Sequence, residues 1–104
     1  MIAMVSEKDL LRIRKQGVEA HVIDPQRNWI QGSFKGLDFQ AMIFEKPSKF
    51  GIRQGKTSKL GVKRSGSAEG WIVASFDRGW DIVPKTKVAR ELVTILALKK
   101  QRRR

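Results

Sequence analysis

The chain has 104 residues, of which 22 are lysine or arginine and ten are aspartate or glutamate, so it carries a net charge of +12 and has a pI near 10.8. This length is enough for one domain with a modest core, and the absence of cysteine excludes disulfides, zinc–thiolate sites and thiol nucleophiles. No apolar run approaches the ~18–20 residues of a membrane span, and the N-terminus lacks a signal-peptide pattern, so we expect a cytoplasmic protein without a membrane partner.

The N-terminal part of the chain predicts a short helix followed by a strand. Ser6 is suited to cap the helix, and Gly17 is suited to end it. Apolar and polar residues then alternate over residues 18–24, which is typical of a strand. That strand carries the only histidine, His21, which could act in a triad with one of the seven serines. A single imidazole on a strand is more often an ordinary strand residue.

The centre of the chain predicts two β-hairpins. Residues 28–36 and 37–45 are strand-like and meet at a Lys-Gly pair, which favours a tight turn. Residues 58–64 and 70–77 form the second pair, joined by a segment rich in serine and glycine. One face of the second strand is wholly apolar and consists of Leu37, Phe39, Ala41 and Ile43.

The segment "GIRQGKTS" (51–58) resembles a nucleotide phosphate-binding loop, but the comparison fails. Such a loop has four residues between its first glycine and the Gly-Lys pair, and this chain has three. A strand-like segment follows where a helix should begin. We therefore expect an ordered basic loop between two strands, with Gly51 and Gly55 at turn positions that require positive φ.

Asp77 and Asp81 flank the sequence "RGW", close enough to suggest a metal or two-carboxylate site. A structural turn is the simpler interpretation, in which Asp77 bonds turn amides or Arg78 and Gly79 takes positive φ. We expect no metal ion, no cofactor and no catalytic residue.

The three tryptophans, Trp29, Trp71 and Trp80, are candidates for stacking on nucleic-acid bases. The alternative for Trp29 and Trp71 is that they start strands and cover the edge of the core. For Trp80 we favour half-exposed packing against the last helix.

After Pro84, residues 85–100 predict an amphipathic helix, because Val88, Ala89, Leu92, Ile95 and Leu96 follow helical spacing. The expected fold is therefore α+β, with an antiparallel sheet of four to five strands packed against this helix and a short N-terminal helix. Residues 1–98 are expected to form the single domain and residues 99–104 a basic C-terminal tail.

Two stretches of the chain account for its net positive charge. Residues 46–64 and 99–104 contain twelve cations and no acidic residue, while the rest of the chain is neutral overall. Such an excess of positive charge favours phosphate backbones, acidic protein surfaces or anionic lipid. The candidate nucleic-acid-binding residues are Lys46, Lys49, Arg53, Lys56, Lys59, Lys63 and Arg64 in one patch, and Lys99, Lys100, Arg102, Arg103 and Arg104 in a second.

Three blocks of the sequence resemble a family of small uncharacterised proteins of phages and mobile elements. These blocks contain the motifs PSxFGI, GxxSKL and DRGWD, and they lie at Phe39–Ile52, Gly55–Leu60 and Phe76–Asp81. The resemblance covers roughly residues 29–96 and brings no known activity. It implies an accessory protein that acts by binding in the host-cell cytoplasm.

Three functions follow as hypotheses. The leading one is a non-enzymatic phage or mobile-element protein whose basic surface engages DNA, RNA or a host nucleoprotein complex. The second is an anti-CRISPR-like inhibitor of a host defence effector that acts through protein–protein contact. The third is a small hydrolase or nuclease that uses Asp77, Asp81 or His21.

Overall fold

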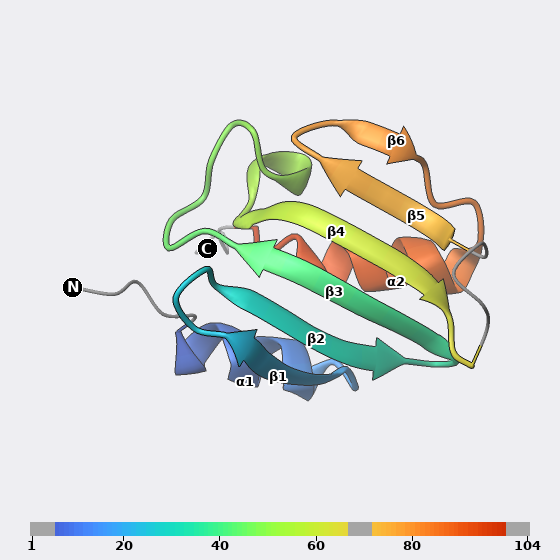
Figure 1. The fold of residues 1–104 in the computed structure, drawn as a ribbon, viewed down its shortest axis with the longest axis horizontal. Helices are drawn as coiled ribbons and strands as arrows, with labels where there is room; N and C mark the ends of the chain where they lie inside the picture. Colours follow the sequence, from blue (N-terminus) through green and yellow to red (C-terminus); the bar gives the residue numbers. More distant parts are fainter. Residues whose placement is uncertain (1–5, 67–71, 100–104) are drawn as a thin grey trace, which may run out of the picture.

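A computed structural model of the chain describes residues 6–66 and 72–99, which form one antiparallel sheet with two helices packed against one of its faces (Figure 1). The strands follow one another in the order β1-β2-β3-β4-β5-β6, so every strand pairs with its neighbours in sequence. The elements are α1 (Glu7–Lys15), β1 (Glu19–Asp24), β2 (Trp29–Phe34), β3 (Leu37–Ile43), a 3-10 turn η1 (Ile52–Gln54), β4 (Thr57–Arg64), β5 (Ile72–Asp77), β6 (Trp80–Ile82) and α2 (Lys87–Leu96).

The α+β class and both predicted hairpins are confirmed, but the predicted strand count was too low. The sheet has six strands within the described residues, rather than four to five. The additional strand is β6, which has only three residues and pairs with β5 across the Asp77–Trp80 turn. Three residues are too few to show the period-two alternation on which a strand prediction rests.

α1 begins and ends as the sequence predicts. The Oγ of Ser6 accepts a hydrogen bond from the Asp9 amide at 3.3 Å, and Gly17 takes a φ of 89° just beyond the helix. Arg14 donates from Nε and Nη2 to the Ala20 carbonyl, at 3.1 and 2.8 Å. The end of the helix is thereby fastened to β1, and Leu10 and Ile13 are buried under the sheet.

α2 packs against the sheet through one apolar stripe. Ala89, Leu92, Val93 and Leu96 are buried, whereas Lys87, Arg90 and Thr94 on the opposite side are exposed. Thr86 caps the helix, its Oγ1 accepting from the Ala89 amide at 3.1 Å. The helix is shorter than predicted because Leu98 adopts a left-handed φ of 51° and folds back into the core.

The core lies between the helices and one face of the sheet. Leu37, Phe39, Ala41 and Ile43 of β3 are all buried on that face, as their alternation predicts. The opposite face of the sheet is covered by no element of the described residues (Figure 1). No helix in the described ranges is long and apolar enough to cross a membrane.

Candidate functional site

The "GIRQGKTS" segment forms hydrogen bonds with the C-terminal end of α2. The Lys56 amide donates to the Ala97 carbonyl at 2.9 Å, and the Thr57 hydroxyl donates to the Leu96 carbonyl. These carbonyls belong to the last turn of the helix and have no partner inside it. The segment therefore serves as a cap for α2, which supports the expectation of an ordered loop between strands.

The two glycines of this segment are required by close packing and not by turn geometry. Gly51 and Gly55 have φ values of −81° and −96°, so the expectation of positive φ was wrong. A Cβ on Gly55 would overlap the Ala97 carbonyl oxygen, and one on Gly51 would overlap the Gly55 carbonyl oxygen. Positive φ falls instead on Arg53 (52°) and Gln54 (60°).

The loop carries Arg53 onto the exposed side of α2. Its Nη1 donates to the Thr94 hydroxyl at 2.7 Å, and that hydroxyl donates to the Arg90 carbonyl at 2.9 Å. Arg90 and Lys87 lie on the same exposed side of the helix. Arg53, Lys87 and Arg90 thus form a line of cations, which we call the helix-side stripe.

The only acidic residue of α2 is already paired. Glu91 accepts from the Lys35 ammonium at 2.7 Å, and both side chains are exposed. Lys35 lies in the β2–β3 turn, so this pair crosses from the sheet to the helix. The pair is electrically neutral, and the helix-side stripe keeps its positive charge.

The structure does not bring the seven predicted cations of residues 46–64 into one patch. Lys46, Lys49 and Arg53 are exposed in the β3–β4 loop. Lys59 and Lys63 lie on the uncovered face of β4, where Asp77 and Asp38 are their direct neighbours across the strands. Arg64 is exposed at the far end of the same strand.

Lys56 differs from the exposed loop cations because its ammonium forms an ion pair. Its Nζ lies 2.9 Å from Oδ2 of Asp9 in α1, and the two side chains are only 21% and 11% exposed. Since a paired, half-buried ammonium is poorly placed to meet a phosphate, we assign Lys56 a structural role.

The second predicted patch is described only at its first residue. Lys99 is exposed, and it follows Leu98, which is fully buried. The hydrogen bond between Ala97 and Lys56 places the start of the tail beside the β3–β4 loop. Lys100, Arg102, Arg103 and Arg104 lie outside the described residues.

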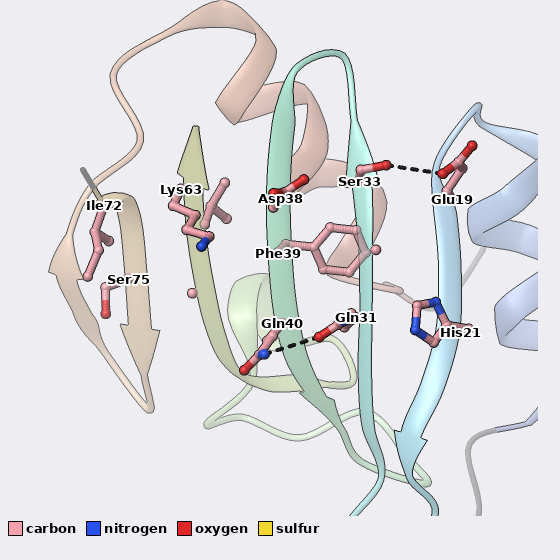
Figure 2. A pocket seen from close by; sticks show the side chains of 13 residues that line it. Glu19, His21, Gln31, Ser33, Asp38, Phe39, Gln40, Lys63, Ile72 and Ser75 are labelled. Carbon is pink, nitrogen blue, oxygen red and sulfur yellow. Dashed lines mark hydrogen bonds between the residues drawn. The ribbon is translucent and has the colours of Figure 1, made fainter. Parts of the chain in front are cut away.

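The uncovered face of the sheet holds a shallow, open hollow of about 770 Å³ (Figure 2). Gly61 of β4 is one of its lining residues, and the absence of a side chain there leaves space between Gln40 and Ser75 on the flanking strands. Gln40 donates to the Gln31 side-chain carbonyl at 3.2 Å, and Ser33 donates to Glu19 at 3.2 Å. The lining combines apolar side chains with charges of both signs, Glu19 and Asp38 against Lys63, so it lacks the uniform positive sign that a phosphate backbone favours.

The candidate histidine lies apart from the two candidate aspartates, of which Asp81 is on β6. His21 is on β1 and Asp77 on β5, four strand spacings away, or roughly 19 Å at ~4.8 Å per strand. Asp77 lies 3.7 Å from the Arg78 Nε, as the structural interpretation of this turn predicts, although Arg78 and not Gly79 takes positive φ. Across residues 6–66 and 72–99, no group of three or more His, Asp or Glu side chains is arranged to hold a metal ion.

The tryptophans differ in their surroundings. Trp29 is partly buried at the start of β2. Trp80 is 38% exposed and packs edge-on against Phe76 of β5, with ring centroids 5.0 Å apart, so its aromatic neighbour is a strand residue. Trp71 lies outside the described residues.

Sequence reasoning missed three residues near the basic loop. Lys87 and Arg90 could have been found from the helical period, which places them opposite the apolar stripe of α2. Phe50 is 54% exposed in the β3–β4 loop, inside the PSxFGI block, and no local pattern marked it as exposed.

The fold and this surface define a small α+β protein with a six-stranded antiparallel meander and a cationic helical side. The chain belongs to the family described as a domain of unknown function (DUF7678), whose model matches residues 28–100. The match begins after β1, so α1 and β1 lie outside the matched residues. No curated protein and no solved structure matches the chain.

Proposed function

We propose that this chain is a non-enzymatic binding protein whose cationic helical side engages the phosphate backbone of a nucleic acid. The observation that carries the proposal is the Arg53–Thr94 hydrogen bond at 2.7 Å, which adds a loop arginine to the cations of α2. The phage or mobile-element origin and the host-cell cytoplasm, which follow from the resemblance of the three blocks, belong to the same proposal.

The helix-side stripe has suitable dimensions for a backbone. Residues 87 to 94 span about 10 Å at 1.5 Å per residue, which corresponds to about three phosphates along one strand of a duplex. Lys46 and Lys49 on the same loop as Arg53, and Lys99 at the start of the tail, extend the positive surface. The uncovered sheet face offers less, because Lys59 and Lys63 each face a carboxylate across the strands.

A comparison of two single-charge variants tests the proposal. Arg90→Gln removes a cation from the helix-side stripe, and Lys63→Gln removes one from the opposite face of the sheet, so both variants have the same net charge. Binding to DNA and RNA should weaken in Arg90→Gln, and the slope of log K against log salt should fall by about one. Lys63→Gln should bind like the parent protein.

Two results would contradict the proposal. One is the absence of binding to any DNA or RNA at ~50 mM salt, where phosphate contacts are strongest. The other is an equal loss of affinity in both variants, which would show that net charge alone and not the helical side governs binding.

A second candidate function is protein–protein contact, the basis of the anti-CRISPR-like hypothesis. It is favoured by the exposed apolar side chains at the β5–β6 edge: Ile72, Trp80, Ile82 and Val83. Apolar groups that gather on a surface often mark a protein interface. Capture of a host defence effector that is lost in Ile82→Lys and retained in Arg90→Gln would favour this function over the first.

A further inference from the structure

Phe50 is an exposed aromatic ring on an ordered loop. Its side chain is 54% exposed, while Ile52, two residues later, is fully buried. The Phe50 amide donates to the Ser48 hydroxyl at 3.1 Å, and the Ser48 amide donates to the Gly55 carbonyl at 3.0 Å. These bonds close the loop and hold the backbone that presents the ring.

Cations lie on both sides of this residue in the sequence, and one of them lies over the ring. The Lys49 ammonium lies over the ring, 5.1 Å from its centroid. Arg53 follows three residues later and is fastened to Thr94 of α2. A ring beside positive charges offers an apolar face where a polyanion would be attracted, which is the arrangement that single-stranded nucleic acids require.

We propose that Phe50 is a stacking platform for an unpaired base of single-stranded DNA or RNA, with the adjacent phosphates held by Lys49 and the helix-side stripe. This inference rests on the proposed function and names its substrate class. The ring needs a base whose face is free, and in a duplex both faces of each internal base are covered by stacked neighbours. The base would use the side of the ring that Lys49 does not cover.

The other described aromatic side chains are less suited to this role. Trp29 is partly buried in the sheet, and Trp80 packs against Phe76 at the opposite edge from α1. Phe34, Phe39 and Phe76 are in the core, and Phe44, which directly follows β3, is partly buried. Of the two exposed aromatic residues that the structure describes, Phe50 and Trp80, Phe50 is the more exposed, and it lies on the cationic loop.

The test compares three ligands: an oligothymidylate of about 16 nucleotides, an abasic oligonucleotide of the same length, and a duplex. Phe50→Ala should weaken binding to the oligothymidylate by roughly 5- to 150-fold, the range of base–aromatic stacking. Its affinity for the abasic strand and for the duplex should stay unchanged, because the phosphate contacts remain. Phe50→Trp, which keeps an aromatic face, should retain most of the affinity.

Leu11→Ala is the matched control, since Leu11 is 57% exposed and lies on α1, outside the cationic loop and α2. It should leave binding to all three ligands unchanged. If Phe50→Ala weakens binding to the abasic strand as much as to the oligothymidylate, or weakens neither, base stacking by Phe50 is overturned while phosphate binding stands. If the parent protein binds none of the three ligands, the proposed function itself fails.

Discussion

Lys56 Nζ lies 2.9 Å from Asp9 Oδ2, a contact between residues 47 positions apart in the sequence. Lys56 is the last residue of the β3–β4 loop before β4. Its amide donates a hydrogen bond to the Ala97 carbonyl, just beyond the end of α2. This one residue therefore joins α1, α2 and the sheet. It also joins the N-terminal elements outside the family match to the matched domain.

We expect Lys56→Met to lower the free energy of unfolding by about 1–3 kcal/mol, because it leaves a mostly buried carboxylate without its partner. Urea denaturation measures this change. Asp9→Asn should cost a similar amount, and the double variant should cost less than the sum of the two. The exposed pair Lys35–Glu91 is the control, and Lys35→Met should change stability by less than about 1 kcal/mol. Equal effects at the two lysines would refute the structural role of Lys56.

The glycines of the β3–β4 loop provide a second prediction. Gly55→Ala should destabilise the protein by about 1–3 kcal/mol or more, because the new methyl group overlaps the Ala97 carbonyl oxygen and must displace the end of α2. Gly61→Ala is the control, since nothing lies within 4 Å of a Cβ at that position. It should be neutral or slightly stabilising. Thermal unfolding of the two variants decides, and a Gly55→Ala variant as stable as the parent would show that α2 does not dock there.

The sequence predicted the elements that depend on residues close together in the chain, and it failed where a feature depends on a contact with a distant residue. The alternation in β3 and the helical period in α2 depend on neighbouring residues, and both elements form, although α2 ends earlier than expected. β6 is too short to carry such a pattern, so its strand was missed. The glycine prediction failed because Gly55 responds to Ala97, which is far along the chain.

The candidate site shows the same limit more strongly. Charge counting located the cationic stretch 46–64, but it could not distinguish Arg53, which reaches Thr94, from Lys56, which reaches Asp9. These pairs are 41 and 47 residues apart, and only the packed fold brings them together. Local sequence patterns therefore could not predict that the cations of this stretch are divided between the loop, the buried pair and the uncovered sheet face.

The Arg53–Thr94 hydrogen bond leads to a third prediction, made on the proposed function. Thr94→Val preserves shape and charge but removes the hydroxyl that positions the guanidinium. We expect nucleic-acid affinity to fall by about two- to five-fold, comparable to the ~0.5–1 kcal/mol of one modest hydrogen bond. The salt slope should stay unchanged, because no cation is lost. A change in slope without a change in affinity would show that Arg53 contacts phosphate by another route.

The boundary between domain and tail provides the last prediction. Leu98 is fully buried and Lys99 is exposed, so the packed domain should end at residue 98. A protein truncated after Leu98 should unfold at nearly the same urea concentration as the full chain, whereas truncation after Ala97 should cost about 2–4 kcal/mol through the loss of a buried leucine.

The removal of residues 99–104 also takes away five cations, and the salt slope of nucleic-acid binding should become shallower by ~0.7–0.9 for each phosphate contact that is lost. Unfolding and binding measurements on the two truncated proteins separate these roles. If truncation after Leu98 lowers stability as much as truncation after Ala97, the tail is part of the fold. If it leaves the salt slope unchanged, the tail takes no part in binding and the contacts come from the helical side alone.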